Sequence, residues 1–371
     1  MSAKKTQEVK FYSLNQILSR HAQYNIIFGE RSNGKTYAVL KHGIQNYCKN
    51  GKQMAIVRRW KEDLRGKRGA AMFDSLVAND EIRRITNGEY TTVYHYSGRW
   101  YFSNFDEKTG KQVPSPEPFA YAFALSDMEH DKSSSYPNIT TIMFDEFLTR
   151  QYYLPDEFVT FMNVVSTIVR YRRDVTIFML GNTVNKYCPY FKELGLTNIL
   201  KMEKGKIDVY SYGESELKVA VEYADSPNKS KPSDLYFAFN NPKLDMITGG
   251  TWEMAMYPHL PVKYESKDIL FMYFIVFGGS TLQCEIVQKN DCLFTYIHRK
   301  TTPIKDEDND IIYTMEHDPR PNHFRRLTRP ASKLERKIHS LFTREKVFYQ
   351  DNEVGEVVRN YLITSERDKV T

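Results

Sequence analysis

The stretch Gly29-Glu30-Arg31-Ser32-Asn33-Gly34-Lys35-Thr36 directly follows the apolar run Asn25-Ile26-Ile27-Phe28. It has the spacing Gly-x4-Gly-Lys-Thr, in which the glycines let the backbone curl so that successive N–H groups face a phosphate. A helix beginning at Lys35 would add the positive end of its dipole. Lys35 would reach the β and γ phosphates, and the Thr36 hydroxyl would ligate Mg²⁺. We therefore predict a strand, a loop that binds ATP, and a helix; the alternative is a solvated glycine turn.

A second motif is an apolar strand that ends in two acids, Asp145-Glu146 after residues 140–144. An ATPase needs a carboxylate that holds Mg²⁺ and a base that aligns the attacking water. Asp145 is predicted to complete the metal site with Thr36, and Glu146 to polarise the water. An acid pair after a strand is by itself a common start of a solvated loop. Its combination with the phosphate loop favours an ATPase.

Polar and basic residues flank the next apolar strand, expected at 175–180. Asn182 follows that strand and is predicted to sense the γ-phosphate or hold the water; a helix cap or turn is the alternative. Before the strand lie Arg170, Arg172 and Arg173, at the end of a helix expected over 155–171. If subunits form a ring, one of these arginines could reach a neighbour's nucleotide. A solvated basic face is equally compatible with this segment.

Composition limits the class of protein. The chain has 371 residues, 41% hydrophobic and 26% charged, which is typical of globular proteins and long enough for two domains. The net charge is +6, so contact with nucleic acid would depend on local clusters. The four cysteines lack a Cys-x-x-Cys spacing, which makes a reducing compartment more compatible than a zinc site or a disulfide framework. Cys284 and Cys292 could face each other on neighbouring strands, but we expect buried free thiols there. Without a signal peptide or a membrane-spanning run, the sequence predicts a soluble cytoplasmic protein.

Strand and helix patterns alternate through the first 200 residues, which is typical of an α/β domain with a mainly parallel sheet. The sequence predicts strands at 25–28, 53–58, 121–125, 139–144 and 175–180, a hairpin at 91–103, and helices at 35–49 and 155–171. This inventory fits a P-loop ATPase core of the ASCE, RecA-like kind over residues 1–205. Residues 206–261 are predicted to be a linker region, because 225–234 are rich in Ser, Pro, Lys and Asn.

A smaller β-rich domain is predicted over 262–371. Three strands at 269–277, 281–288 and 293–298 are separated by short turns, as in an antiparallel meander. An acidic loop follows at 305–310, and one or two helices begin near residue 333.

Two basic clusters indicate contact with phosphates. Residues 58–69 hold six cations against two acids, and we expect a mobile loop in which Arg65, Lys67 and Arg68 contact a nucleic-acid backbone. In the C-terminal domain, Arg325 and Arg326 belong to a basic stretch that would contact nucleic acid or an acidic partner. Solvated surfaces are the alternative for both clusters.

Taken together, segments 28–38, 57–61 and 135–147, then Thr167-Ile168-Val169-Arg170 and Gly181-Asn182-Thr183-Val184, resemble the DNA-packaging ATPase (encapsidation protein) of small short-tailed, protein-primed bacteriophages, a relative of large terminases. The resemblance is clear over the first two hundred residues and thin but collinear beyond. It implies a ring-forming motor, typically a pentamer, on the portal of an empty capsid. ATP hydrolysis would drive double-stranded DNA inward, in the host cell cytoplasm.

The resemblance also implies residue roles. Residues 29–36 would bind the phosphates, with Thr36 and Asp145 at the metal and Glu146 as the catalytic glutamate. Arg170 falls on the family's trans-acting arginine finger. Lys61 falls on a cationic position tied to nucleotide exchange or hydrolysis.

The C-terminal domain would resemble the RNase H-like nuclease domain of terminases. Such a nuclease needs several carboxylates to hold two metals. The strand at 269–277 has none and Glu285 is isolated on the next strand, so we expect lost nuclease activity and a role in binding DNA or the portal. A structural RNA is a further partner that the resemblance leaves open.

Two other classes of function remain compatible with the sequence. A P-loop kinase shares the phosphate loop, although Glu146 would activate water where a kinase must exclude it. A nucleic-acid-dependent ATPase of another kind, or a DNA-binding scaffold with a regulatory nucleotide, is the other alternative.

Overall fold

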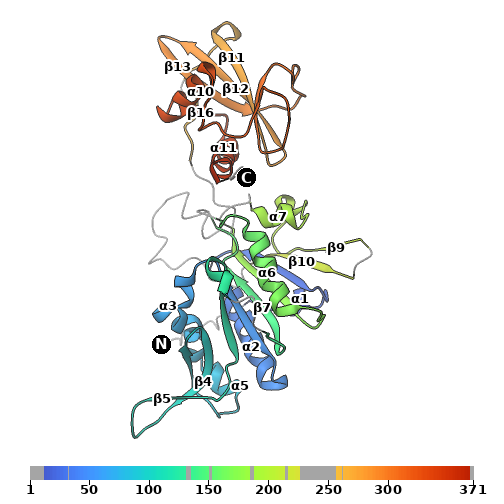
Figure 1. The fold of residues 1–371 in the computed structure, drawn as a ribbon, viewed down its shortest axis with the longest axis vertical. Helices are drawn as coiled ribbons and strands as arrows, with labels where there is room; N and C mark the ends of the chain where they lie inside the picture. The colour runs from blue at the N-terminus through green and yellow to red at the C-terminus, as the bar shows by residue number, and fades with distance from the viewer. Residues whose placement is uncertain are drawn as a thin grey trace, which may run out of the picture. The chain divides into compact units, whose positions relative to one another are not determined.

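The structure is a computed structural model that describes residues 12–31, 33–130, 135–149, 153–183, 188–213, 216–225, 256–260 and 262–367. The chain divides into two compact units, residues 1–253 and 254–371. Figure 1 shows each unit with its own sheet.

The first unit is built on a ten-stranded sheet with the order β3-β4-β6-β2-β7-β8-β1-β10-β9, with β5 added to β4. The strands from β6 to β10 along this path run parallel, and the strands at both edges are antiparallel. The strands are β1 (Tyr24–Gly29), β2 (Gln53–Arg58), β3 (Thr92–Tyr96), β4 (Arg99–Phe105), β5 (Gln112–Pro114), β6 (Ala120–Ala124), β7 (Ile139–Asp145), β8 (Thr176–Asn182), β9 (Ile207–Ser211) and β10 (Lys218–Ala224).

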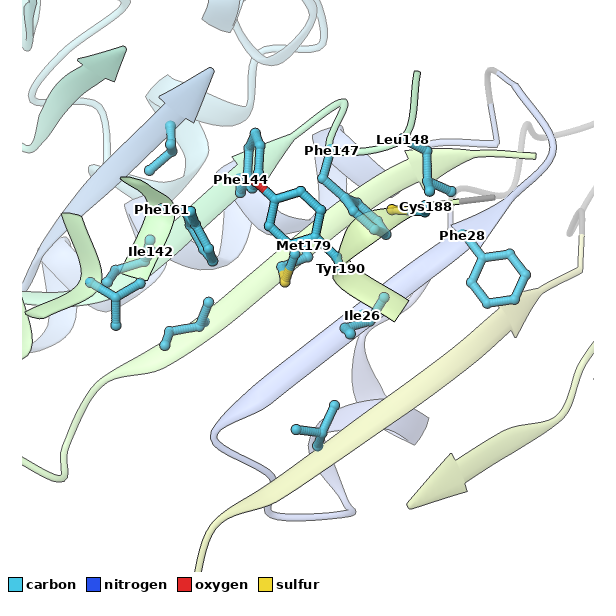
Figure 2. Close-up of a cluster of buried hydrophobic side chains, with 14 of the residues drawn as sticks. Ile26, Phe28, Ile142, Phe144, Phe147, Leu148, Phe161, Met179, Cys188 and Tyr190 are labelled. Atoms are coloured by element: carbon cyan, nitrogen blue, oxygen red, sulfur yellow. The ribbon is translucent and has the colours of Figure 1, made fainter. Parts of the chain in front are cut away.

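Helices cover both faces of the central strands, which are therefore buried on both sides. On one face α2 packs over a core that contains Val39 and Ile44. On the other face, Phe161 of α6 and Tyr190 of α7 pack against Phe144 of β7 (Figure 2). The helical segments are α1 (Asn15–Leu18), α2 (Lys35–Asn50), η1 (Lys61–Leu64), α3 (Gly66–Ala70), η2 (Ala71–Phe73), α4 (Asp74–Ala78), α5 (Glu81–Ile85), η3 (Leu125–His130), α6 (Glu157–Val169), α7 (Pro189–Glu193) and η4 (Ile199–Lys201).

The predicted α/β fold with its mainly parallel sheet is confirmed, but the boundary at residue 205 is too early. β10 pairs in parallel with β1, the strand that leads into the phosphate loop, and β9 extends the sheet beyond it. The strands β9 and β10 thus belong to the first unit's sheet rather than to a linker. Residues 226–255, which make up most of the remaining predicted linker, lie outside the described residues.

The second unit holds a six-stranded sheet with the order β15-β14-β11-β12-β13-β16. The predicted meander is confirmed: β11, β12 and β13 are antiparallel neighbours, while β14 lies parallel to β11 and β15 parallel to β14. The elements are η5 (Ser266–Asp268), β11 (Ile269–Phe277), β12 (Ser280–Lys289), β13 (Cys292–Arg299), β14 (Ile311–Thr314), β15 (His323–Phe324), α10 (Lys333–Thr343), β16 (Val347–Tyr349) and α11 (Asn352–Arg367).

Two predictions about bulk properties can be compared with the structure. All four cysteines are free thiols; Cys188 and Cys284 are buried, and Cys48 and Cys292 are exposed. The prediction of burial is therefore confirmed for Cys284 and wrong for Cys292. Within the described part of the chain, none of the helices combines the length and the apolar character that crossing a bilayer requires.

Candidate nucleotide-binding and catalytic site

The predicted phosphate loop and acid pair meet at one edge of the first sheet. β1, β7 and β8 are parallel neighbours, so their carboxyl ends lie together. Gly29 at the end of β1 is in register with Asn182 at the end of β8. Asp145 at the end of β7 is in register with Leu180. The carboxyl edge of a parallel sheet is where such folds bind ligands.

The phosphate loop has the backbone shape that its glycines allow. A Cβ atom on Gly29 would lie 2.5 Å from the Ala224 carbonyl oxygen of the neighbouring strand, so only glycine fits there. Gly34 has a φ of 92°, which a residue with a side chain rarely adopts, and α2 begins immediately after it. Of the remaining loop residues, Arg31 is exposed, and Ser32 lies outside the described residues.

Lys35 is held inside the loop by three oxygen acceptors. Its Nζ donates to the Glu30 carbonyl oxygen at 2.6 Å, to Asn33 Oδ1 at 3.0 Å and to Asn182 Oδ1 at 3.4 Å. Burial lowers the pKa of Lys35 to about 8, against the raising effects of Asp145 and Glu30. The structure thus places Asn182 beside the residue that would bind the γ-phosphate. The Glu30 side chain is in turn paired with Lys204, 3.1 Å away.

The acid pair lies directly across from the loop. Thr36 Oγ1 donates to Asp145 Oδ1 at 3.0 Å. Arg58, the last residue of β2, pairs with Asp145 Oδ2 and with Glu146 Oε2, each at 2.7 Å. Burial raises the pKa of Asp145, and the Arg58 guanidinium opposes that rise. The Arg58 guanidinium therefore holds both carboxylates. The sequence pattern alone places Arg58 only in the basic cluster of residues 58–69.

Glu146 has a left-handed backbone, with φ of 59°, and an exposed side chain. Such strain in a non-glycine residue clusters at functional sites, because the surrounding structure must hold it. Arg59 supplies that support: its guanidinium donates to the Glu146 carbonyl oxygen at 3.2 Å and to the Phe147 carbonyl oxygen at 2.8 Å. Arg59 is itself fixed by Glu157 through two contacts of 2.7 and 2.8 Å. Sequence reasoning missed this pair; the local signal is the adjacent Arg58-Arg59 at the end of a buried strand.

These residues fit magnesium and a triphosphate. The Thr36 hydroxyl and the Asp145 carboxylate are oxygen ligands of the kind that Mg²⁺ takes. α2 has no side-chain cap and no acid in its first turn, which leaves its amino end suited to an anion. Asn33 Nδ2 is buried and has no hydrogen-bond partner among the described residues, so the loop holds a donor still to be satisfied.

Arg170 lies at the opposite edge of the sheet from this site. It directly follows α6 and precedes β8. Two positions later, Arg172 contacts Ile139, the first residue of β7. The seven residues of β8 separate the Arg170 turn from Asn182, a span of about 20 Å at the usual rise per residue. Arg170 therefore cannot reach its own subunit's phosphate loop. Any action on a nucleotide has to be in another copy of the chain.

Arg172 and Arg173 differ from Arg170. The Arg172 guanidinium donates to the carbonyl oxygens of Ile139 at 2.7 Å, of Ile168 at 2.8 Å and of Pro137 at 2.9 Å. It is a structural residue that ties the end of α6 to the start of β7. Arg173 is exposed and pairs with exposed Glu216.

The basic segment after β2 is not the loosened loop that we predicted. Residues 61–70 form short helical turns, η1 and α3, anchored by buried Leu64 and by the Gly69 carbonyl oxygen, which accepts from Trp100 Nε1 at 2.8 Å. Lys61 forms an ion pair with Asp127. Arg65, Lys67 and Arg68 are exposed on this segment.

The basic residues of the second unit are partly used within it. Arg326 Nε donates to the Ser365 carbonyl oxygen at 3.0 Å, and Arg325 is half-buried.

Glu285, the one acid of β12, is held by neighbours that are not carboxylates: it accepts from Tyr264 at 2.5 Å and from Gln283 at 2.6 Å, and lies 3.3 Å from His298. No group of three or more His, Cys, Asp or Glu side chains suited to a metal occurs among the described residues.

The fold and the site define a phosphate-loop protein of the RecA-like α/β class. Comparison with known proteins places it more closely, because residues 6–365 match the family described as Podovirus DNA encapsidation protein (Gp16). The chain belongs to this family and is a DNA packaging protein.

Individual relatives agree with this assignment. The DNA packaging proteins of Bacillus phage PZA and Bacillus phage phi29 are each 26% identical over 275 residues, covering 73% of this chain and 74% of the relative. A chain in a solved structure of the bacteriophage Phi-29 viral genome packaging motor assembly shares the fold, with a TM-score of 0.56 and 24% identity. The match covers 96% of this chain and 98% of that chain.

Proposed function

We propose that this chain is an ATPase motor subunit that hydrolyses ATP to move double-stranded DNA into a preformed capsid. The observation that supports the chemistry best is the contact of Thr36 with Asp145 at 3.0 Å, beside the buried Lys35. It joins the phosphate loop to the acid pair in one site, as the hydrolysis of a magnesium nucleotide requires. Family membership supports DNA as the transported polymer.

In this proposal each side chain has a defined task. Lys35 and the first N–H groups of α2 bind the phosphates, and Thr36 and Asp145 hold Mg²⁺. Magnesium, when bound, stabilises the charge that develops on the phosphates. Glu146 accepts a proton from the attacking water, and Asn182 fixes the position of Lys35 or of that water. Lys61 acts on nucleotide exchange through its pairing with Asp127.

The remaining roles concern partners. Arg170 completes the site of a neighbouring copy, because it lies too far from its own; this supports a ring, which we propose to be a pentamer that docks on the portal in the host cell cytoplasm. Exposed Arg65, Lys67 and Arg68 would contact the DNA backbone, together with Arg325 and Arg326. A structural RNA is an optional further partner.

We further propose that the second unit is an RNase H-like domain without nuclease activity. Its strand order supports this assignment, because three antiparallel strands followed by strands parallel to the first are the arrangement of that fold. Residues 300–310 and 315–322, the connections before β14 and β15, contain no helix, a departure from an active domain of this type.

The test is ATP turnover by the full chain with and without double-stranded DNA. We expect DNA to stimulate phosphate release, and Glu146→Gln to bind ATP while losing turnover by at least about a hundredfold. Transfer of phosphate to a small-molecule acceptor in place of water would favour the kinase alternative. Turnover in Glu146→Gln at the wild-type rate would contradict the catalytic assignment.

A further inference from the structure

A tyrosine-rich surface lies on one face of the edge strands β3, β4 and β6, where the hairpin of β4 and β5 extends from the first unit (Figure 1). Cross-strand pairing places Tyr94 opposite Tyr101, Tyr96 opposite Arg99, and Arg99 opposite Tyr121. The rings of Tyr94 and Tyr96 stack with centroids 6.4 Å apart, and the Arg99 guanidinium lies 5.7 Å from the Tyr121 ring. We call these five residues the tyrosine face.

Most of the tyrosine face lies outside the two hydrophobic cores, and only Tyr121 packs against one of them. The opposite side of the same strands, with Trp100 and Phe102, packs against the α2 layer. Tyr94, Tyr96 and Tyr101 belong to neither core, and Tyr96 is 65% exposed. A large aromatic patch on a protein surface usually marks an interaction site.

The charge pattern of these strands favours a protein partner. Over the 17 residues of β3, β4 and β6, Arg99 is the only Lys, Arg, Asp or Glu. A surface on which nucleic-acid bases stack also needs cations that follow the phosphates. Protein interfaces instead combine tyrosine and arginine with a depletion of other charges at their centre.

The tyrosine face continues into the turn that holds Arg170. Tyr136 contacts the Tyr121 ring at 5.5 Å between centroids, and its carbonyl oxygen accepts from Arg172 at 3.3 Å. Tyr171, beside Arg170, is fully exposed. Contacts through Tyr136 and Arg172 thus link the tyrosine face to the turn that holds Arg170.

The outer side of α6, the helix that ends at the Arg170 turn, is also uncharged. Residues 158–169 contain no charged side chain, and Val159 is 55% exposed. Helices that face water usually place charged residues on that side. An uncharged helix therefore leads directly to Arg170, which follows its last residue.

From this continuity we propose that the tyrosine face and the turn around Arg170 form one docking surface for a second copy of this chain. The inference rests on the proposed ring motor, because it takes the position of Arg170 as the sign that a neighbour is present on this side. The partner copy is favoured over nucleic acid by the single cation on the three strands, and the rigid Arg172 contacts fix the geometry of the turn.

The experiment measures self-association of the full chain by analytical ultracentrifugation with Mg²⁺ and a slowly hydrolysed ATP analogue. Tyr96→Lys and the double variant Tyr96→Lys/Tyr101→Lys are compared with Leu270→Lys, a control at a 62% exposed residue in the second unit. We expect the association constant to fall at least about tenfold for Tyr96→Lys, with more for the double variant and no change for the control. At concentrations where the chain is monomeric, its affinity for nucleotide should stay at the wild-type value, because Tyr96 is exposed and remote from the phosphate loop.

Other results would overturn the proposal. Wild-type association in the double variant, or a wild-type chain that stays monomeric under these conditions, would exclude this face as an interface between copies. Loss of DNA or RNA binding with unchanged association would assign the face to nucleic acid. In each of these cases DNA-stimulated ATP turnover of the wild-type chain still tests the motor proposal separately.

Discussion

The buried pair of Arg59 and Glu157 allows a quantitative test of how the catalytic glutamate is positioned. We consider Arg59→Met, which removes the guanidinium while keeping much of the side-chain volume. The Glu157 carboxylate, whose side chain is 1% exposed, would then lose its two charged contacts. Removing one partner of a buried ion pair costs about 3–5 kcal/mol, because the other charge stays in a poorly solvating interior.

The double variant Arg59→Met/Glu157→Leu removes both charges and serves as the matched control. It leaves the Glu146 and Phe147 carbonyl oxygens without the Arg59 donor, and it removes the Glu157 carboxylate that accepts from Tyr190 at 3.0 Å and from the Leu154 N–H at 2.7 Å. Each lost hydrogen bond contributes about 1 kcal/mol, so we expect the double variant to lose about 4 kcal/mol in unfolding free energy. The single variant loses the two carbonyl contacts and also leaves the Glu157 charge unpaired, so we expect it to lose about 6 kcal/mol.

Urea unfolding followed by tryptophan fluorescence is the suitable assay, since Trp60 and Trp100 belong to the first unit. At a slope of about 3 kcal/mol per molar urea, the single variant should shift the midpoint by more than about 1 M. A loss below about 1 kcal/mol, or a double variant as unstable as the single one, would refute the burial of this pair. The double variant should still hydrolyse ATP at least about tenfold more slowly than wild type, because Glu146 loses its backbone support.

Three further predictions follow from the site. Protonated Lys35 favours the triphosphate and its pKa is lowered to about 8, so ATP affinity should fall by up to about tenfold per pH unit above pH 8, and a dependence that persists in Lys35→Ala would contradict this. Arg172→Ala should leave ATP affinity unchanged but lower turnover at least about tenfold, since the Arg170 turn loses its carbonyl contacts; unchanged turnover would show that the turn holds its shape without them. Replacing Arg65, Lys67 and Arg68 with Gln should make the slope of log K for DNA binding against log salt concentration shallower by about 0.9 per lost phosphate contact. An unchanged slope would indicate that DNA contacts the second unit instead.

The phosphate loop and the acid pair could be predicted because their signals are local. A buried strand that ends in Gly29 or in Asp145 fixes the direction of the chain at that point, and parallel strands bring both ends to one edge. The meander of the second unit is equally local, since short turns join β11, β12 and β13. Spacing and alternation were sufficient for these features.

The missed features depend on contacts between distant residues. Arg59 and Glu157 are 98 positions apart, and either alone is an ordinary charged residue in the sequence. β10 contains Glu222, which is unusual for a buried strand. Its carboxylate accepts from the Tyr12 hydroxyl 210 positions earlier, at 2.5 Å, so the N-terminal segment compensates for the charge. Sequence patterns within one segment do not contain such pairings.

The distance of Arg170 from its own phosphate loop makes shared catalysis the central claim. The most direct measurement mixes Arg170→Ala subunits with Glu146→Gln subunits and records ATP turnover against the mixing ratio. Each variant alone should be inactive, whereas a mixture should regain turnover, because a subunit with intact Glu146 can receive Arg170 from its neighbour. Absence of recovery at every ratio, with association shown to occur, would contradict the account.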